Sequence, residues 1–449
     1  MTRPKAEQPW RGRRLHFVGI GGAGMSGLAL VAAQLGAAVT GSDRAESSYL
    51  AELRAAGIEP AIGHDAANVP DGAELVYSTA IPEDNPERAA ARELGLRRLH
   101  RGELLGEVSA LKRCLAVSGT HGKTTTTAMI VHALRACGMD PAFLVGGEIQ
   151  VGDGPPRNAA WGTGEWIVVE GDESDRSLLQ LDPEIAVVTN AELDHHATYG
   201  SLAELQATLR EFLAGAAQAV VWDRPELLAL RDGPVVAFDV ADPELDADGS
   251  RFTVDGVAVR LAVPGAHNAL NAAAALAACK LAGADPERAA AALAEFRGVA
   301  RRFERLGQTE AGAVVYDDYA HHPTEVAATL QAARTLAPRR LVAVFQPHLY
   351  SRTAALWREF GAALALADVP GVVDIYPARE RAEDFPGITG LRVAEAAADA
   401  VGGRRVLWLA GLDDAERVLR AELRDGDLCV VLGAGDIDGL GRRLVTAGA

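Results

Sequence analysis

The chain has 449 residues, of which 44 are basic and 61 acidic, so its formal net charge is −17 and its pI is near 5.1. This balance argues against a nucleic acid or an anionic membrane surface as a partner. An anionic ligand would instead have to be held by local groups such as helix N-termini, Mg²⁺ and single arginines. At roughly 150 residues per domain, the length predicts about three domains.

Cysteine usage and hydropathy indicate the compartment. The four cysteines lie far apart without C-x-x-C spacing, which disfavours a disulfide framework or a zinc site and fits a reducing environment. No apolar run reaches about 18 residues, and no signal-peptide pattern is seen. We therefore expect a cytoplasmic enzyme with no membrane insertion, and the oligomeric state cannot be read from the sequence.

The first hundred residues alternate apolar strands with helices, which predicts a parallel, doubly wound sheet in an N-terminal domain at residues 1–110. A basic stretch of low periodicity, residues 97–113, is interpreted as a linker to the next domain. The expected elements are strands at residues 15–19, 37–40 and 74–77 and helices at residues 25–35 and 49–56.

The first expected strand is followed by a glycine-rich turn, GIGGAG at residues 19–24. It fits G-x-G-x-x-G, and Asp43 follows about 20 residues later at the end of the next strand. This is the dinucleotide fingerprint. Taken alone it leaves three alternatives open: a nicotinamide site, a phosphate-binding turn for another nucleotide, or a turn needed only for close packing.

The most informative segment is SGTHGKTTTT at residues 118–127, which lies between an apolar strand at 114–117 and a helix at 128–137. Its glycines would let the backbone curl round a polyphosphate, Lys123 would reach the β and γ phosphates, and the Thr124 hydroxyl would hold Mg²⁺. The spacing G-x-x-G-K-T is two residues shorter than the common pattern, so an ordinary turn with a solvated lysine is the alternative. The chain has only four lysines against forty arginines, which favours a chemical requirement for Lys123.

Two further strands, at residues 166–170 and 185–190, each end in polar groups. Glu170 is followed by GDESD, and the second strand runs into AELDHH, which includes His195. Open α/β sheets bind ligands at the carboxyl ends of their strands. One glutamate with one histidine favours Mg²⁺ or Mn²⁺ over zinc, and a solvated acidic loop is the alternative.

The rest of this region predicts a second α/β domain at residues 111–300, with a small antiparallel excursion at 239–261 and an Ala-rich helix at 268–282. Asn268 stands at the start of that helix, where it could cap the helix or offer its amide to a base edge. Both interpretations stay open. Further elements are expected as a helix at 201–214 and strands at 219–222 and 235–238.

A third α/β unit is predicted at residues 301–449. Two loops, at 316–325 and 346–353, each follow a strand and together hold three histidines, His321, His322 and His348. Clustered loop histidines with Arg352 nearby suggest a small anionic ligand. The expected strands lie at 313–316, 341–345, 371–375, 405–409 and 428–432.

Taken together, these motifs resemble the Mur ligase family over residues 14–445. The resemblance implies a three-domain α/β fold with an N-terminal Rossmann-like UDP-binding domain, a central P-loop ATPase-type domain and a C-terminal Rossmann-like domain. It implies ATP-dependent amide formation through an acyl phosphate in peptidoglycan precursor synthesis. The motifs are HFVGIGGAGMSGLA, SGTHGKTTT, EGDESD, TNAELDHH, HNALNAAAA, RRFERLG, DDYAHHPTEV, FQPHLYSRT and GAGDI.

The ligands implied by the resemblance are ATP, Mg²⁺ or Mn²⁺, UDP-N-acetylmuramate and L-alanine, so the turn at 19–24 would hold UDP. The residues implied to contact the sugar nucleotide are Gly22, Gly24, Asp43 and Ser78. Those implied to contact ATP are Gly119, Thr120, His121, Gly122, Lys123, Thr124 and Thr125, with Asn268 at the adenine, Arg302 near the phosphates and Asp317 near the ribose. The implied metal ligands are Thr124, Glu170 and His195, and His348 and Arg352 would orient the amino acid. Catalysis would rest on Lys123, Glu170, His195 and Arg352.

Alternatives remain within and outside the family. A recycling ligase that adds a whole tripeptide to the same sugar nucleotide shares most of the motifs. No lysine stands between His195 and Lys280, which fits the alanine-adding member, because that member lacks the carbamylated lysine of its relatives. A nicotinamide dehydrogenase and a non-catalytic nucleotide sensor are the alternatives from other classes.

Overall fold

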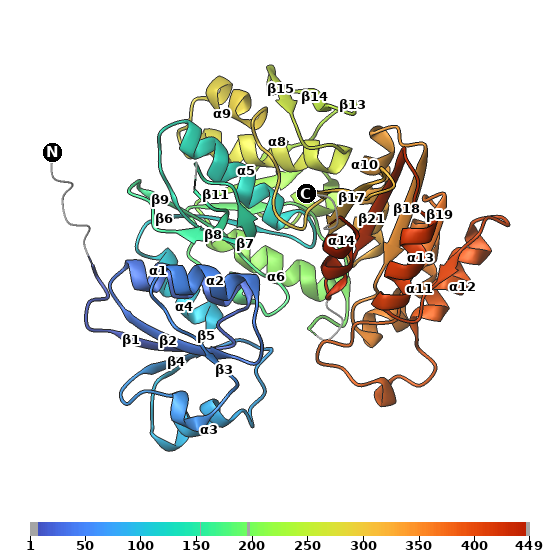
Figure 1. The fold of residues 1–449 in the computed structure, drawn as a ribbon. Helices are drawn as coiled ribbons and strands as arrows, with labels where there is room; N and C mark the ends of the chain where they lie inside the picture. The colour runs from blue at the N-terminus through green and yellow to red at the C-terminus, as the bar shows by residue number, and fades with distance from the viewer. Residues whose placement is uncertain (1–7, 153, 195–197, 446–449) are drawn as a thin grey trace. The chain divides into compact units, whose positions relative to one another are not determined.

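The structure is a computed structural model that describes residues 8–152, 154–194 and 198–445 (Figure 1). The chain forms two compact units. The first comprises Met1–Glu192, Leu202–Asp239 and Ala274–Ala292, and the second comprises Leu193–Ser201, Val240–Ala273 and Leu293–Ala449. Each unit is described by itself below.

The first unit begins with a five-stranded sheet of order β3-β2-β1-β4-β5, in which all neighbours are parallel. This confirms the doubly wound pattern expected for the first hundred residues. Its strands are β1 (Arg14–Val18), β2 (Ala38–Asp43), β3 (Ala61–Ile62), β4 (Glu74–Tyr77) and β5 (Arg98–His100). Its helices are α1 (Ala23–Gln34), α2 (Ser48–Ala55), α3 (Pro86–Glu93) and α4 (Arg101–Ser109), and a 3₁₀ turn, η1, covers Ala66–Asn68.

The interpretation of residues 97–113 as a linker is wrong, because this stretch supplies the edge strand β5, the helix α4 and the start of the next strand. Helix α4 packs closely against η2 (Ser177–Gln180), a 3₁₀ turn of the central region. A Cβ on Gly102 would lie 2.7 Å from the Ser177 Cβ, and one on Gly106 would lie 2.5 Å from the Gln180 carbonyl oxygen. The helical periodicity of this stretch is weak because Gly102 and Gly106 occupy the side of α4 that lies against η2, where a larger side chain would not fit.

The first unit also contains a seven-stranded sheet of order β12-β11-β10-β6-β9-β7-β8, whose neighbours are parallel except at β7 and β8. Its strands are β6 (Arg113–Ser118), β7 (Ala142–Ile149), β8 (Arg157–Ala160), β9 (Trp166–Glu170), β10 (Ile185–Val188), β11 (Gln218–Trp222) and β12 (Val236–Phe238). Its helices are α5 (Lys123–Ala136), α6 (Leu202–Gly215), α7 (Pro225–Leu228) and α9 (Pro286–Leu293). The longer α8 (Ala266–Leu281) begins in the second unit and ends in the first.

The central strands of this sheet are continuous apolar runs because helices cover both of their faces. Their parallel register pairs Val117 with Glu170 and Ser118 with Val188. The carboxyl ends of β6, β9 and β10 therefore lie at one edge of the sheet. Glu170, the last residue of β9, and Asn190, which follows β10, are thus placed at that edge, as expected from the sequence.

The second unit has a three-stranded antiparallel sheet, which confirms the excursion expected at 239–261, and a six-stranded sheet of order β16-β17-β21-β18-β19-β20. The latter is parallel except between β16 and β17. The strands are β13 (Glu244–Asp246), β14 (Gly249–Val254), β15 (Val257–Leu261), β16 (Glu304–Gln308), β17 (Val314–Asp318), β18 (Arg340–Phe345), β19 (Val369–Val372), β20 (Leu407–Trp408) and β21 (Asp427–Leu432).

Helices cover both faces of this six-stranded sheet. One face packs against α10 (Pro323–Thr335), α11 (Tyr350–Leu364) and α12 (Gly390–Ala400). The other packs against α13 (Leu412–Glu422) and α14 (Ile437–Val445). A third 3₁₀ turn, η3, covers Ala382–Asp384. None of the helices in the described residues is both long and apolar enough to cross a membrane.

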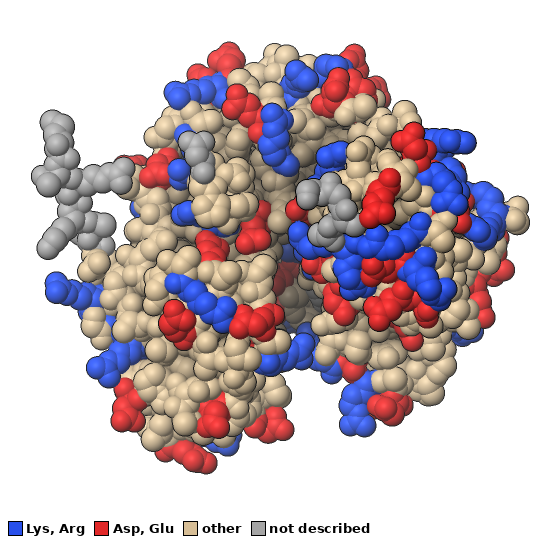
Figure 2. Space-filling model, viewed as in Figure 1, with Lys and Arg blue, Asp and Glu red and all other residues tan. Residues whose placement is uncertain are grey.

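Surface charges of both signs lie side by side over much of the face shown in Figure 2. Many charged side chains of the described residues form ion pairs within one unit. Arg113 and Glu184 are 2.6 Å apart, and Arg443 and Glu416 are 2.7 Å apart. The opposite charges in such pairs offset each other, so these arginines do not form a basic surface that would attract an anionic ligand.

Candidate active site

The loop that joins β6 to α5 has the conformation expected of a phosphate-binding turn. Gly119 and Gly122 both have positive φ, at 125° and 81°. A Cβ on Gly119 would lie 2.3 Å from the Thr189 Oγ1, so no larger residue fits there. Helix α5 begins at Lys123, five residues earlier than predicted, and its N-cap Gly122 makes no side-chain cap hydrogen bond. The open helix N-terminus lies directly at the loop, which suits an anion.

The end of β10 holds this loop in place. The Thr120 hydroxyl donates to the Glu192 carbonyl oxygen at 2.8 Å, and the His121 amide donates to the Asn190 Oδ1 at 2.9 Å. Asn190 Nδ2 in turn donates to the His121 carbonyl oxygen at 2.9 Å. The sequence analysis interpreted the TNAELDHH segment after β10 only as a source of metal ligands. It missed that this segment also holds the phosphate loop in place, although an asparagine directly after a buried strand could have indicated such a role.

Lys123 lies over its own loop. Its Nζ donates to the carbonyl oxygens of Gly119 at 2.7 Å and Thr120 at 3.1 Å, and it is 2.9 Å from the Glu173 Oε2. Burial alone would lower the pKa of Lys123, but the carboxylates of Glu173 and Asp172 outweigh it and raise this pKa above its ordinary value. The ammonium is therefore charged at neutral pH. Glu173 was not singled out from the sequence.

Two of the predicted metal ligands come together beside the loop. The Thr124 hydroxyl donates to the Glu170 Oε2 at 3.2 Å, and the Gly146 amide donates to the Glu170 Oε1 at 2.5 Å. Both residues present oxygen atoms next to the open N-terminus of α5. Such oxygen donors fit Mg²⁺ or Mn²⁺, for which phosphate and water would supply the remaining ligands. His195, the third predicted ligand, lies outside the described residues.

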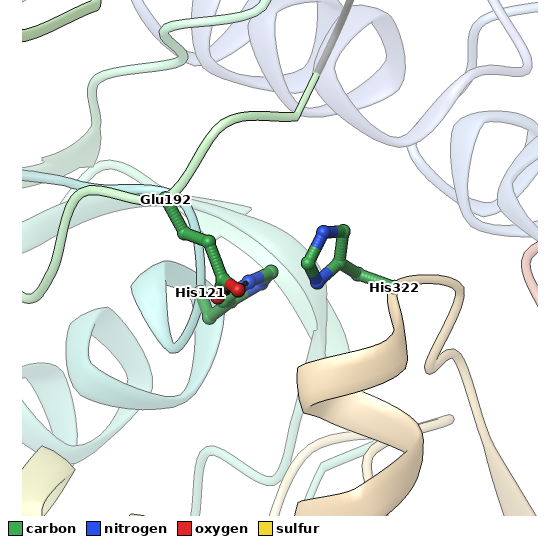
Figure 3. A group of neighbouring side chains, drawn as sticks. All are labelled: His121, Glu192 and His322. Carbon is green, nitrogen blue, oxygen red and sulfur yellow. Dashed lines mark hydrogen bonds and ion pairs between the residues drawn. The ribbon is translucent and has the colours of Figure 1, made fainter. Parts of the chain in front are cut away.

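His121 lies next to Glu192 in the same unit, as Figure 3 shows. Its Nε2 is 3.0 Å from the Glu192 Oε2. His322, also drawn in Figure 3, belongs to the second unit, where its side chain accepts from the Thr324 amide and caps α10. Thr125, another predicted nucleotide contact, is buried in the first turn of α5.

The second glycine-rich turn lies between β1 and α1. The Gly21 amide donates to the Asp43 Oδ2 at 2.8 Å, and the Ser47 hydroxyl donates to the Gly21 carbonyl oxygen at 3.1 Å. Asp43 thus holds the turn in shape, and its predicted contact with the sugar nucleotide stays a prediction. Gly22 is the N-cap of α1 and forms no side-chain cap hydrogen bond, so this helix N-terminus is also open.

Ser78 and Gly24 lie near this turn. Ser78 directly follows β4, which neighbours β1 in the parallel sheet, so it stands at the same edge as the turn. A Cβ on Gly24 would be 3.1 Å from the Arg101 Nη1. Gly24 therefore makes room for a guanidinium that the sequence analysis did not identify.

In the second unit, Asn268 lies inside α8, two residues after the helix begins at Ala266, so its prediction as a capping residue is wrong. Its Nδ2 donates to the Pro264 carbonyl oxygen at 2.7 Å, and its Oδ1 lies 3.4 Å from the Asn271 Nδ2. The amide is buried in the first turn of the helix. Its predicted contact with adenine stays a prediction.

Asp317 pairs with Arg301, the residue that precedes Arg302 in the chain. The Arg301 Nε donates to the Asp317 Oδ2 at 3.2 Å. Burial raises the pKa of Asp317 to about 7, against the opposing effect of Arg301. Arg302 lies over the Tyr319 ring, with its Cζ 5.0 Å from the ring centroid. The predicted contacts of Arg302 with phosphate and of Asp317 with ribose stay predictions.

Arg352 and His348, the predicted amino-acid contacts, lie together at the start of α11. The Arg352 Nη1 is 3.2 Å from the His348 Nδ1. The opposite side of the guanidinium forms a two-pronged pair with Asp194, from Nε to Oδ1 at 2.9 Å and from Nη2 to Oδ2 at 3.1 Å. Both side chains are almost fully buried. Arg352 therefore already holds a carboxylate of the chain, which the sequence analysis missed.

His321 lies beside this pair. Its Nε2 is 3.8 Å from the Asp194 Oδ2, and its Nδ1 is 3.0 Å from the Tyr319 carbonyl oxygen. Burial lowers the pKa of His321 to about 3, so the imidazole is neutral at physiological pH. Because a carbonyl oxygen only accepts, this contact favours a hydrogen on Nδ1. His321, His348, Arg352 and Asp194 thus form one polar cluster in the second unit.

Comparison with known proteins gives three consecutive family matches. Residues 14–113 match the description "Mur ligase family, catalytic domain", residues 117–279 match "Mur ligase middle domain", and residues 301–435 match "Mur ligase, glutamate ligase domain". Together with the three central α/β sheets, these matches give a three-domain α/β fold.

Full-length relatives agree with these matches. The chain is 43% identical over 450 residues to a UDP-N-acetylmuramate–L-alanine ligase of Rubrobacter xylanophilus, covering 96% of this chain and 99% of the relative. The solved UDP-N-acetylmuramate–alanine ligase of Thermotoga maritima is similar with a TM-score of 0.83 and 30% identity, over 96% of this chain and 98% of that one. A murein peptide ligase of Psychrobacter arcticus has a TM-score of 0.73 and 25% identity, with the same coverages of 96% and 98%. The chain belongs to the Mur ligase family.

Proposed function

We propose that this protein joins L-alanine to the lactyl carboxylate of UDP-N-acetylmuramate at the expense of ATP, in peptidoglycan precursor synthesis. The observation that carries this proposal is the pair of open helix N-termini in the first unit, each preceded by a glycine-rich turn. The turn before α5 has the lysine and the oxygen ligands of a triphosphate site. The turn before α1 has a nucleotide fingerprint but neither the lysine nor the metal ligands. This difference fits ATP, which is cleaved, at the first turn and the sugar nucleotide, which carries the acceptor carboxylate, at the second. The similarity to the two alanine ligases supports the choice of substrates.

The chemistry follows from the weakness of a carboxylate as an electrophile. The carboxylate oxygen attacks the γ-phosphorus of ATP, the bond to the bridging oxygen breaks, and ADP leaves with an acyl phosphate formed. The amine of L-alanine then attacks the acyl carbon and forms the C–N bond, the bond from that carbon to the phosphate oxygen breaks so that phosphate leaves with the electron pair, and one proton is lost from the nitrogen. Both steps depend mainly on positioning and on neutralising charge at phosphate oxygens.

Lys123 supplies the movable positive charge in this scheme. Its ammonium is held by the Gly119 and Thr120 carbonyl oxygens and by Glu173. A lysine on a flexible stem can exchange such contacts for phosphate oxygens while it remains charged. We expect the amides of the loop to bind the phosphate chain and Lys123 to follow the charge that develops during transfer.

Thr124 and Glu170 would hold a divalent cation at the loop, with His195 as a further ligand implied by the family resemblance. Such a cation would neutralise phosphate charge and align the triphosphate for transfer. The amide of Gly146 fixes the other oxygen of Glu170, which orients the carboxylate toward Thr124. Mg²⁺ and Mn²⁺ are the candidates that suit these oxygen donors.

The amino acid would bind at the cluster of Arg352 and His348 in the second unit. Arg352 is already paired with Asp194, so the carboxylate of L-alanine has to displace Asp194 or bind beside it. A guanidinium that exchanges one carboxylate for another keeps its charge compensated throughout.

We propose a cytoplasmic location, which agrees with four free cysteines.

The test measures ADP release by the purified protein with UDP-N-acetylmuramate and Mg²⁺ while the amine substrate is varied. We expect release with L-alanine, and glycine and L-serine define how strictly the methyl group is selected. Release with the tripeptide L-alanyl-γ-D-glutamyl-meso-diaminopimelate but not with L-alanine would instead identify a peptide-recycling ligase, which the similarity to the murein peptide ligase makes the nearest alternative. Tight binding of NADH without ADP release would overturn both.

A further inference from the structure

Arg101 connects two parts of the first unit that the sequence treats separately. It is the first residue of α4, which follows the N-terminal sheet. Its Nε donates to the Asp175 Oδ2 at 2.8 Å, and its Nη2 donates to the Asp172 Oδ2 at 2.6 Å. Both carboxylates belong to the GDESD segment that follows β9. One guanidinium therefore joins the N-terminal sheet to the segment beside the phosphate loop.

The remaining nitrogen of this guanidinium faces the other glycine-rich turn. A Cβ on Gly24 would lie 3.1 Å from the Arg101 Nη1, so Nη1 contacts the start of α1. Within the described part of the chain, no residue accepts a hydrogen bond from Nη1. Two N–H donors of a charged group thus lie at a helix N-terminus that is itself uncapped. This combination suits the oxygen atoms of a phosphate.

Arg101 cannot easily move away from this position. Helix α4 packs on η2 through Gly102 and Gly106, whose missing side chains allow contact with Ser177 and Gln180. Burial alone would lower the pKa of Arg101, but the nearby carboxylates outweigh it and raise this pKa. The guanidinium is therefore charged, fixed on one side and open on the other.

The fixed side leads to Lys123. Glu173, which is 2.9 Å from the Lys123 Nζ, lies in sequence between the two carboxylates that Arg101 holds, Asp172 and Asp175. Asp172, which accepts from the Arg101 Nη2 at 2.6 Å, directly precedes Glu173 in the chain. A change in the position of Arg101 is thus transmitted to the segment that positions Lys123.

We propose that Arg101 donates from Nη1 to the diphosphate of the sugar nucleotide and, through Asp172 and Asp175, couples occupancy of that site to the position of Lys123. This inference rests on the proposed function for the identity of the sugar nucleotide. It assigns Arg101 a direct contact with substrate and a positioning role toward Lys123. A purely structural clamp between α4 and the GDESD segment is the competing explanation.

The test uses Arg101→Lys, which keeps a positive charge but cannot hold two carboxylates and a phosphate at once. The matched control is Arg113→Lys. Arg113 also forms a two-pronged pair, with Glu184 at 2.8 and 2.6 Å, in the same unit but at the start of β6, the end of the strand opposite the phosphate loop. Calorimetry gives the Kd of UDP and of UDP-N-acetylmuramate for each protein, with and without Mg²⁺ and a non-hydrolysable ATP analogue. Turnover gives kcat and the KM of each substrate, and thermal unfolding gives Tm.

We expect Arg101→Lys to weaken UDP and UDP-N-acetylmuramate alike by about 10- to 100-fold, which corresponds to one lost charge-assisted hydrogen bond. In the wild-type protein the ATP analogue should change the affinity for the sugar nucleotide by about fivefold or more, and this factor should approach one in the variant. The control should stay within about twofold of wild type in both Kd values and in kcat.

Other outcomes overturn the inference. Unchanged Kd values with a lowered Tm would identify Arg101 as a structural clamp, and loss with UDP-N-acetylmuramate but not with UDP would exclude the diphosphate contact. A wild-type protein whose affinity does not respond to the ATP analogue would refute the coupling. Failure of the proposed function has a different signature, because wild type would then bind UDP without releasing ADP when L-alanine is added.

Discussion

Lys123→Ala separates the catalytic role of this lysine from its structural one. Glu173 is 1% exposed and lies 2.9 Å from the Lys123 Nζ, so removal of the ammonium leaves a buried carboxylate without its positive partner. Breaking a buried ion pair by removing one partner typically costs about 3–5 kcal/mol. The Lys123 side chain is 15% exposed, so water can partly replace it, and we expect a loss near the lower limit, about 3 kcal/mol. For a unit of this size that corresponds to a fall in Tm of roughly 6–12 °C.

The same change should remove most of the turnover. Deleting one preorganised charged donor from a transition state typically lowers kcat by about 10²–10³-fold. The assay is ADP release at saturating ATP, UDP-N-acetylmuramate and L-alanine, with the protein held well below its Tm so that unfolding does not contribute. Near-normal kcat in this variant would refute the role assigned to Lys123.

A second variant makes the reasoning sharper. Lys123→Ala combined with Glu173→Gln also removes the buried negative charge that has lost Lys123, so thermal stability should be partly restored. Activity should not return, because the positive charge is still missing. A double variant as unstable as Lys123→Ala would show that Glu173 is not the partner that matters for stability.

Three further predictions concern other parts of the site. Gly119→Ala should abolish ATP binding in calorimetry, since its Cβ would lie 2.3 Å from the Thr189 Oγ1 at a φ of 125°, and affinity within about threefold of wild type would contradict this. Because burial raises the pKa of Asp317 to about 7, the fold binds its proton more tightly than the unfolded chain does, so this group's contribution to stability is lost as pH rises from about 4 to 7. Asp317→Asn should therefore gain stability relative to wild type over that range in urea titrations, and parallel pH curves would disprove the assignment. Arg352→Lys loses the two-pronged geometry seen with Asp194 and should raise the KM of L-alanine about tenfold or more while the Kd of UDP-N-acetylmuramate is unchanged; an equal effect on both ligands would point to general damage.

Much of the fold was readable from the sequence because its strands are buried on both faces. Continuous apolar runs at β6, β9 and β10 stand out against polar loops, and β9 was predicted with its observed bounds, Trp166–Glu170. The small antiparallel sheet was also expected, from the Asp and Gly residues in its turns. Short edge strands such as β3 and β5 were missed, since two or three residues carry no periodic signal.

The stretch at 97–113 shows where local pattern misleads. Gly102 and Gly106 lower the helical propensity and amphipathicity of α4, which made the segment resemble a linker. Both glycines are needed because α4 lies against η2 closely enough to exclude side chains. Only the packing partner, about 75 residues away in sequence, explains their presence.

The sequence by itself determined the chemical groups of the site. These are a lysine and a threonine at a glycine-rich turn, and a glutamate at the end of β9, the strand that lies beside β6 in the sheet. These are local motifs whose function depends on spacing within a few residues. The tertiary structure alone decided the partners of those groups. Glu173 holds Lys123, Asn190 clamps His121, and Asp194 pairs with Arg352. Such pairs join residues 50 to 158 positions apart, and their geometry is set by sheet register and helix packing, which no local pattern specifies.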